Sequence, residues 1–192
     1  MRLRQFSILF LVLFLAGCGG DVIEENMSGH LPDFEFTTQD NEPLGLNDLE
    51  GNWWIADFMY TNCRSVCPMM TANMLQVQSQ LNEENIDITI VSFSVDPDYD
   101  TPEILKEYAN EYQVDTTNWS FLTGYDFDTV QELSVHSFKT SLEQAGPDTG
   151  DDQIAHGTNF FLVNPAGEVV KKYDGLGQGA NDDVVEDLKN IL

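Results

Sequence analysis

Runs of hydrophobic residues alternate with amphipathic segments along the chain in the order expected of an α/β domain. The segment 53–60, WWIADFMY, is nearly all apolar, which is typical of a strand buried on both faces of a sheet. The segment 86–96, IDITIVSFSVD, predicts a second buried strand. Between them, apolar residues recur at i, i+4, i+7 and i+11 and predict an amphipathic helix ending near residue 85: Met70, Met74, Val77 and Leu81.

The same alternation continues on both sides of this unit. Thr101 as N-cap and Pro102 at the first helical position predict a helix over 101–113. Phe34 and Phe36 alternate before a turn and predict a hairpin within 32–51. The remaining pattern predicts strands at 119–124, 158–165 and 168–175, and helices at about 126–139 and 181–192. We therefore predict an α/β fold with a central mixed sheet flanked by helices, an N-terminal β-hairpin and no internal repeat.

The first 30 residues have a different pattern. Residues 1–17 carry two arginines, an apolar stretch and then small residues, as an export signal does, and the apolar stretch is shorter than the roughly 20 residues of a membrane span. The quartet LAGC at 15–18 resembles the lipobox of bacterial lipoproteins, which implies cleavage before Cys18 and a lipid anchor on it. An ordinary signal peptide with an incidental cysteine is the alternative.

We therefore expect a signal peptide at 1–17, a polar, lipid-anchored tether at 18–30 and one domain at 31–192. This organisation places the domain outside the cytoplasm, held at the cell membrane by Cys18.

Acidic residues dominate the composition. The chain has 33 aspartates and glutamates against 8 lysines and arginines, and a formal net charge of −25 at pH 7. Such a surface argues against nucleic acid and anionic lipid headgroups as partners, and it favours a cationic ligand or a basic partner surface. An acidic surface that serves solubility alone would give the same charge, so the charge bears only weakly on function.

Two cysteines, Cys63 and Cys67, follow the first buried strand and enter the first long helix. Such turns bind ligands in α/β sheets, and a helix N-terminus, here with Arg64 beside Cys63, favours the thiolate. The C-x-x-x-C pair alone is compatible with a redox dithiol, a two-ligand metal site or two buried thiols. Zinc usually requires four ligands, whereas two thiolates and one imidazole suit copper.

The chain has three histidines that could complete a metal site. His30 lies in the expected tether and His136 in a predicted helix, where an ordinary structural histidine is the simpler interpretation. His156 lies between the acidic loop 143–153 and an apolar strand, and it could reach the cysteine loop. Among the nearby methionines only Met69 is free to face the pair, and no methionine is assigned as a ligand.

The motifs, in their order and spacing, resemble the Sco (SenC/PrrC) family of thioredoxin-like copper proteins, especially the lipid-anchored members of Gram-positive bacteria. The resemblance extends from about residue 32 to the C-terminus and rests on four segments: TNCRSVCPMMT, SVDPDYDTPEILKEYA, WSFLTG and HGTNFFLVNPAGEVV. The family's copper-binding cysteines fall on Cys63 and Cys67, and its distal histidine ligand falls on His156. Asp96 and Asp100 match the family's aspartate motif, which is implicated in shaping the metal site.

The resemblance implies a thioredoxin-like fold, a bound copper ion, Cu(I) or Cu(II), and a role in maturing the binuclear copper centre of cytochrome c oxidase subunit II. Either copper delivery or reduction of the recipient's cysteines would serve that role. Other copper chaperones or thiol-disulfide proteins are further candidate partners. The chain departs from the family pattern at Gly157, where less glycine is expected, and at Asn164, where an aspartate is frequent.

Two rival functions remain open from the sequence. The first is a thiol-disulfide oxidoreductase without obligatory copper, or a peroxiredoxin-like enzyme, in which Cys63 and Cys67 form the redox dithiol. The second is an inert acidic binding module whose cysteines form a permanent disulfide.

Overall fold

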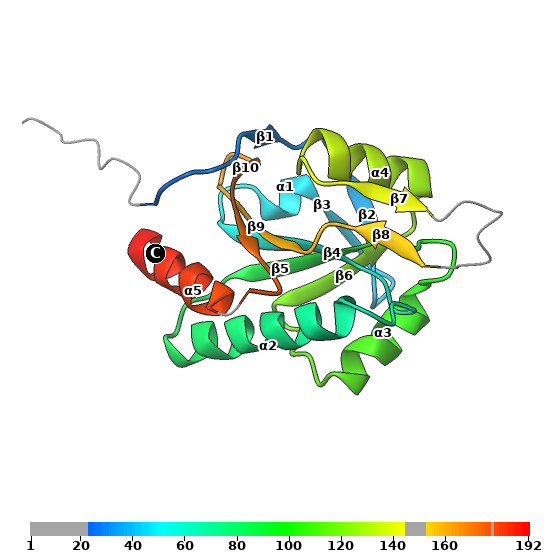
Figure 1. Ribbon diagram of the computed structural model, residues 1–192, viewed down its shortest axis with the longest axis horizontal. Coiled ribbons are helices and arrows are strands. Elements are labelled where there is room, and N and C mark those ends of the chain that lie inside the picture. The colour runs from blue at the N-terminus through cyan, green and yellow to red at the C-terminus, as the bar shows by residue number, and fades with distance from the viewer. Residues whose placement is uncertain (1–22, 145–152, 178) are drawn as a thin grey trace, which may run out of the picture.

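The computed structural model describes residues 23–144, 153–177 and 179–192. Within them, a mixed sheet of eight strands forms the centre of the molecule (Figure 1). In spatial order the strands are β1 (Gly29–His30), β10 (Glu168–Asp174), β9 (Asn159–Val163), β4 (Trp54–Met59), β5 (Thr89–Ser94), β6 (Trp119–Thr123), β2 (Glu35–Thr38) and β3 (Pro43–Gly45). The three central strands β4, β5 and β6 run parallel, and the other neighbours pair antiparallel. The predicted mixed sheet and the hairpin β2–β3 are confirmed.

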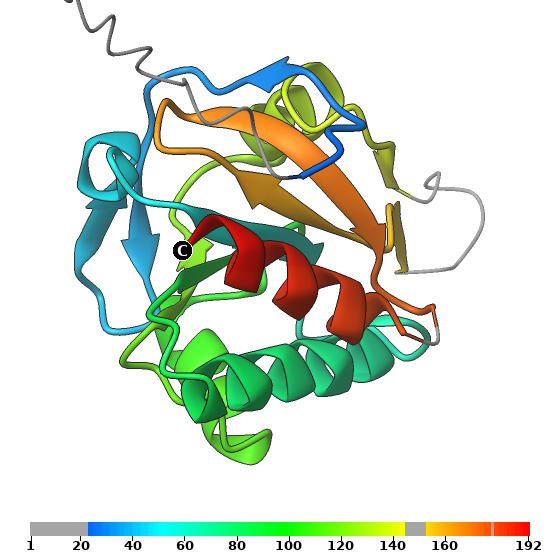
Figure 2. The same cartoon turned by 90° about the vertical axis from the view of Figure 1, so that its left-hand side faces the viewer.

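Helices cover both faces of this sheet. Helices α2 (Cys67–Glu83) and α3 (Pro102–Glu111) lie on one face, and α4 (Phe127–His136) lies on the other (Figure 1). The C-terminal helix α5 (Ala180–Ile191) lies beside α2 (Figure 2). No helix among the described residues is long and apolar enough to span a membrane.

Burial explains why these segments form these elements. All six residues of β4 are buried, as the nearly all-apolar pattern predicts for a strand between two layers. The helical stripe of Met70, Met74, Val77 and Leu81 is fully buried, and each such side chain contributes about 1.5–3 kcal/mol. Thr101 caps α3 by accepting a hydrogen bond from the Ile104 amide, as its sequence position predicts.

The domain begins earlier than the sequence pattern predicts. Part of the expected tether lies against the sheet: β1, which contains His30, pairs with β10, and Ile23 is buried. The Asn26 side chain donates to the Lys172 carbonyl and accepts from the Lys172 amide, so it occupies the open edge of β10. The polar composition of residues 23–30 therefore reflects edge pairing, not a free tether. The expected signal peptide and Cys18 lie outside the described residues.

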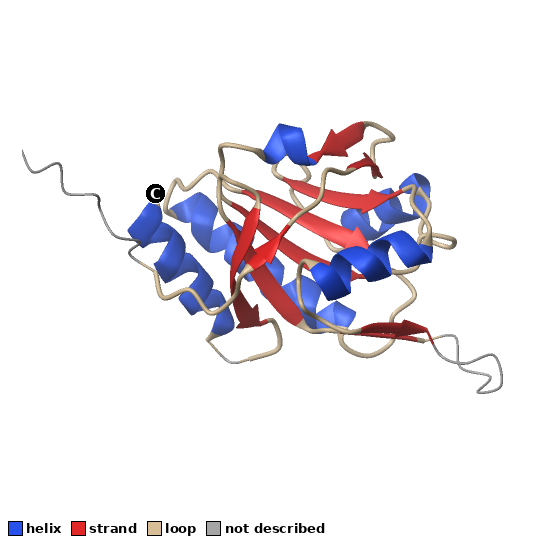
Figure 3. Cartoon of the chain, turned by 90° about the horizontal axis from the view of Figure 1, so that it is seen from above, coloured by secondary structure: helices blue, strands red, loops and turns tan. Residues whose placement is uncertain are grey.

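Three further short elements, besides β1, were not predicted. Helix α1 (Leu46–Leu49) follows the hairpin directly. Strands β7 (Leu142–Gln144) and β8 (Ile154–His156) pair antiparallel as a separate two-stranded sheet, so both ends of the expected acidic loop are structured. Seen from above, these two strands extend from one end of the molecule beyond the main sheet (Figure 3). Residues 145–152, the middle of that loop, lie outside the described residues.

Candidate metal and thiol site

The two cysteines lie at the carboxyl end of β4, where the chain turns into α2. Cys67 is the first residue of α2, and Pro68 follows at a position where the missing N–H costs no helical hydrogen bond. The Cys67 amide donates to the Cys63 Sγ at 3.4 Å, so the helix N-terminus faces that sulfur. Cys63 is 8% exposed and Cys67 is fully buried, and both are free thiols. Both thiols thus belong to buried residues, and Cys67 is the more completely enclosed of the two.

His156, the last residue of β8, completes a three-residue cluster with the cysteines. Its Nε2 lies 3.2 Å from the Cys67 Sγ, and its Nδ1 lies 2.9 Å from the Gly157 carbonyl oxygen. Because a carbonyl only accepts, Nδ1 carries the proton and the Nε2 lone pair faces the thiols. The ligand atoms of Cys63, Cys67 and His156 all lie within 4.8 Å of one another.

This donor set fits copper better than a structural zinc ion. Two sulfurs and one imidazole suit Cu(I) and Cu(II), whereas a closed zinc site takes four protein ligands. Among the described residues this is the one group of three or more cysteine, histidine or acidic side chains close enough to hold an ion. Neither Asp96 nor Asp100 belongs to it.

The environment shifts the pKa values of the two thiols in opposite directions. A hydrogen bond from the Cys67 thiol lowers the pKa of Cys63, and burial opposes this effect; the contacts with His156 and with the Cys67 and Ser65 amides lower the pKa further. The hydrogen bond to Cys63 and burial raise the pKa of Cys67. The site therefore favours the thiolate at Cys63 over the thiolate at Cys67. Arg64, which the sequence suggested as a cause, is exposed and is not among these causes.

Asp100 holds the start of the cysteine loop through hydrogen bonds to Thr61. It is fully buried and accepts hydrogen bonds from the Thr61 amide, the Thr61 hydroxyl and the Ser94 hydroxyl. Asp96 shapes the same turn, because its carbonyl accepts from the Asp100 amide and its own amide donates to Ser94. These contacts fix the backbone two residues before Cys63, which is a supporting position and not that of a ligand.

Asp57 is the functional candidate that sequence reasoning missed. It is a carboxylate in the middle of β4, 2% exposed, and its Oδ1 has no hydrogen-bond partner among the described residues. Burial raises its pKa to about 6, partly offset by a hydrogen bond from Ser92 and by the charge of His156. Its charge in turn contributes to the raised pKa of Cys67. The sequence signal that could have identified Asp57 is that it is the one acidic residue within the apolar run WWIADFMY.

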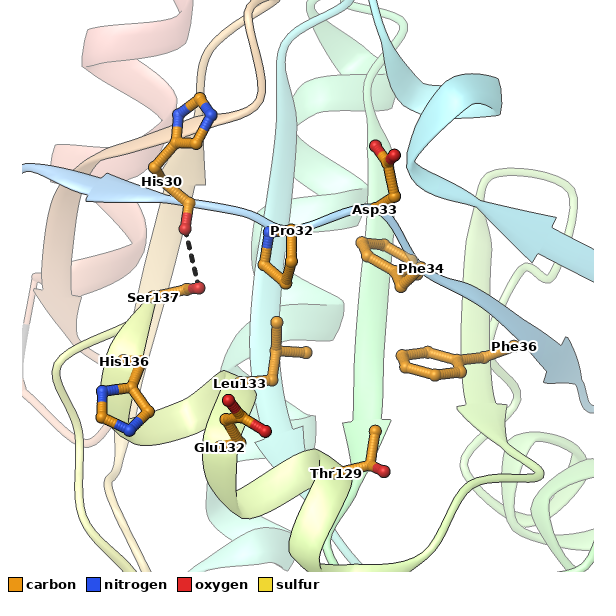
Figure 4. A pocket seen from close by; sticks show the side chains of 10 residues that line it. All are labelled: His30, Pro32, Asp33, Phe34, Phe36, Thr129, Glu132, Leu133, His136 and Ser137. Atoms are coloured by element: carbon orange, nitrogen blue, oxygen red, sulfur yellow. Dashed lines mark hydrogen bonds between the residues drawn. The ribbon is translucent and has the colours of Figure 1, made fainter.

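The other two histidines lie apart from the cysteines. His30 belongs to β1, and His136 is the last residue of α4. Both border an apolar pocket of about 430 Å³ that also contacts Phe34, Phe36 and Leu133 (Figure 4). The Ser137 hydroxyl donates to the His30 carbonyl and closes one side of this pocket. No residue of the cysteine–histidine cluster contributes to it.

Gly157, the departure from the family pattern, permits a close contact beside His156. Its amide donates to the Ser141 carbonyl at 3.2 Å, which brings it against Thr140. A Cβ at position 157 would lie 1.8 Å from the Thr140 Oγ1 and 3.1 Å from the Thr140 Cβ. Glycine is therefore required for the packing of the histidine segment on residues 140–141.

Replacing Gly157 by alanine is expected to lower the free energy of unfolding by about 1–3 kcal/mol, because the added methyl overpacks this contact. Thermal denaturation of the reduced, metal-free protein measures the effect. Combining it with Thr140→Ala, which removes the nearest atom, should restore part of the loss. A melting temperature unchanged by Gly157→Ala would contradict the assigned packing.

Known proteins are similar to this chain in sequence and in fold. Residues 24–192 match the SCO1/SenC family. The SCO1 protein homolog of Bacillus subtilis (strain 168) is 42% identical over 180 residues, 94% of this chain and 92% of that protein. A putative copper-binding protein of Stutzerimonas stutzeri is 30% identical over 72% of this chain and 66% of its own length.

Solved structures agree with these sequence relatives. A SCO1/SenC family lipoprotein from Bacillus anthracis str. Ames is 41% identical, with a TM-score of 0.80 over 86% of this chain and 98% of that one. BsSco, described with a disulfide switch and as a member of the Sco family of cytochrome c oxidase assembly proteins, is 40% identical, with a TM-score of 0.78 over 88% of this chain and 98% of that one. The predicted thioredoxin-like fold is confirmed.

Proposed function

Because this chain belongs to the SCO1/SenC family, we propose that it is a membrane-anchored, copper-binding factor that assembles the binuclear copper centre of cytochrome c oxidase subunit II. The observation that carries this proposal is the convergence of Cys63, Cys67 and His156 within 4.8 Å. The descriptions of relatives as a copper-binding protein and as an oxidase assembly protein support it.

The arrangement of the three side chains suits a cargo site. Cys67 is fully buried and Cys63 almost fully buried, whereas His156 is partly exposed. A ligand of the recipient could therefore reach the copper ion from the side of His156, while the enclosed sulfur of Cys67 retains it.

The thiol asymmetry favours a second candidate, reduction of the recipient's disulfide. The Cys63 thiolate would attack one recipient sulfur, breaking the disulfide and forming a mixed disulfide. Cys67, after losing its proton, would then attack Cys63, releasing the second recipient thiol and leaving a Cys63–Cys67 disulfide. Two electrons pass to the recipient, whose two sulfurs become thiols. The lowered pKa of Cys63 and the raised pKa of Cys67 suit these successive roles.

Reconstitution with the copper-free soluble domain of subunit II tests both candidates. Copper-loaded protein mixed with the reduced recipient should generate the absorption spectrum of the binuclear centre. Metal-free, reduced protein mixed with the oxidised recipient should transfer two thiol equivalents if reduction is the working chemistry. If neither reaction exceeds that of the Cys63→Ala, Cys67→Ala double variant, the proposed function is wrong.

Membrane anchoring through Cys18 makes a separate prediction. Replacing Cys18 by serine removes the site for the lipid, so the full chain expressed in its host should lose metabolic labelling by a radiolabelled fatty acid. Cys63→Ser is the matched control and should keep the label, because that cysteine is buried in the folded domain. Equal labelling of the Cys18→Ser variant and the wild type would contradict the lipid anchor.

A further inference from the structure

Gln153 binds the backbone on both sides of Cys63. Its Oε1 accepts a hydrogen bond from the Arg64 amide at 3.2 Å, and its Nε2 donates to the Asn62 carbonyl at 3.4 Å. The carboxamide thus pairs with the cysteine loop as a neighbouring strand would, although it is a side chain. Gln153 directly precedes β8, the strand that ends at His156.

Tyr60, which precedes the cysteine loop, binds both Gln153 and the first residue of β8. This residue is buried directly after β4, and its hydroxyl donates to the Gln153 Oε1 at 3.1 Å. The hydroxyl oxygen also accepts from the Ile154 amide at 3.1 Å. The ring stands edge-on to the His156 imidazole with centroids 5.8 Å apart. Burial raises the pKa of Tyr60, so the phenol stays protonated and can donate.

Together these contacts join two segments that are about ninety positions apart in the sequence. One segment carries Cys63 and Cys67, and the other carries His156. The histidine is therefore placed beside the sulfurs by hydrogen bonds at the opposite end of its strand, two and three residues away from the imidazole. Groups that orient a metal ligand in this way commonly change metal affinity about 10–100-fold when removed.

We propose that Tyr60 and Gln153 are positioning residues that hold His156 over the two cysteines and so determine how slowly bound copper is released. This inference rests on the proposed copper site and adds two residues that touch no metal. Both act on the position of His156, because Gln153 binds the backbone of the cysteine loop and Tyr60 binds the Gln153 side chain and the Ile154 amide of β8.

The experiment measures copper dissociation into an excess of a chelator for the wild type, Gln153→Ala and Tyr60→Phe. Gln153→Ala should release copper about tenfold faster or more. Tyr60→Phe, which keeps the ring and removes only the hydroxyl, should accelerate release less. Gln144→Ala is the matched control, since Gln144 is an exposed glutamine of β7 opposite Ile154, and it should release copper at the wild-type rate.

Combining Gln153→Ala with His156→Ala distinguishes a role in positioning His156 from a general effect on the structure. Where the imidazole is absent, adding Gln153→Ala should change the release rate less than twofold. Equal acceleration in both backgrounds, or no acceleration in the wild-type background, would overturn the inference. A wild-type protein that binds no copper at all would instead refute the proposed function.

Hydrogen exchange tests the same contacts without copper. In the reduced, metal-free protein, Tyr60→Phe removes the acceptor of the Ile154 amide, so that amide should exchange at least about tenfold faster. The amides of the central strand β5 serve as the internal control and should exchange at wild-type rates. Unchanged exchange at Ile154 would show that Tyr60 does not hold this strand, whatever the protein does with copper.

Discussion

Replacing Cys67 by alanine should reduce the affinity of the reduced protein for Cu(I) by at least about 100-fold. Cys67 contributes the enclosed sulfur, which lies 3.2 Å from the His156 Nε2, and its loss leaves only the Cys63 sulfur and the imidazole of the partly exposed His156. Loss of a ligand is expected to exceed the 10–100-fold effect of groups that only orient ligands. Competition with a coloured Cu(I) chelator measures the affinity.

Met69→Ala is the matched control for this variant. Met69 also carries sulfur, lies two residues from Cys67 and is 52% exposed, but it is not part of the cluster. Its replacement should leave the Cu(I) affinity within about twofold of the wild type. An affinity that falls with Met69→Ala and persists with Cys67→Ala would mean that the ligands are wrongly assigned.

Asp57→Asn should stabilise the reduced, metal-free protein by about 1–3 kcal/mol at pH 8 and by almost nothing at pH 4. The folded protein raises the pKa of Asp57 from 3.8 to about 6, so folding opposes ionisation of this group. Between these two values the unfolded chain has lost the proton and the folded one keeps it, so stability falls as pH rises. Above about pH 6 the full loss of folding free energy is present, about 3 kcal/mol for a pKa that is raised by about two units.

The amide has no charge and removes this cost while keeping the shape of the side chain. Urea denaturation of wild type and variant from pH 4 to pH 8 measures the difference as a function of pH. A stability difference that is constant over this range would contradict the assignment of a carboxyl group that titrates near pH 6.

Asp100→Asn provides the contrast, because this buried aspartate has partners for both oxygens. Three donors converge on it, from Thr61 and Ser94, and an amide offers only one acceptor oxygen. We expect a loss of about 1–2 kcal/mol at pH 8, the opposite sign to Asp57→Asn. The same denaturation series measures both variants, and equal signs would contradict this account of the two carboxylates.

Local periodicity was sufficient to predict most of the sheet and the helices. The apolar run of β4 and the stripe from Met70 to Leu81 each report burial within one element, so their patterns can be interpreted without knowledge of the rest of the chain. Strand β1 could not be predicted in this way. Its two residues are a strand only because β10, more than 130 positions away, offers an open edge.

The same distinction applies to the site. The spacing of Cys63 and Cys67 at a strand-to-helix turn is visible in the sequence, whereas the selection of His156 over His30 and His136 depended on the family resemblance. The contacts that place His156, from Tyr60 and Gln153, join segments that no local pattern connects. Asp57 was missed because a single acidic residue within an apolar run forms no periodic pattern. The free-energy cost of burying its charge follows only from the structure, in which both faces of β4 are covered.

Electron paramagnetic resonance of the protein with one equivalent of Cu(II) tests the central claim most directly. Residues 19–192 of the wild type, reduced beforehand, should give one copper species with sulfur-to-copper charge-transfer absorption and nitrogen hyperfine coupling. The same protein with His156→Ala should lose the nitrogen coupling and keep the sulfur bands. Nitrogen coupling that persists in the variant, or oxidation of both proteins to the Cys63–Cys67 disulfide without retained copper, would contradict a copper site formed by Cys63, Cys67 and His156.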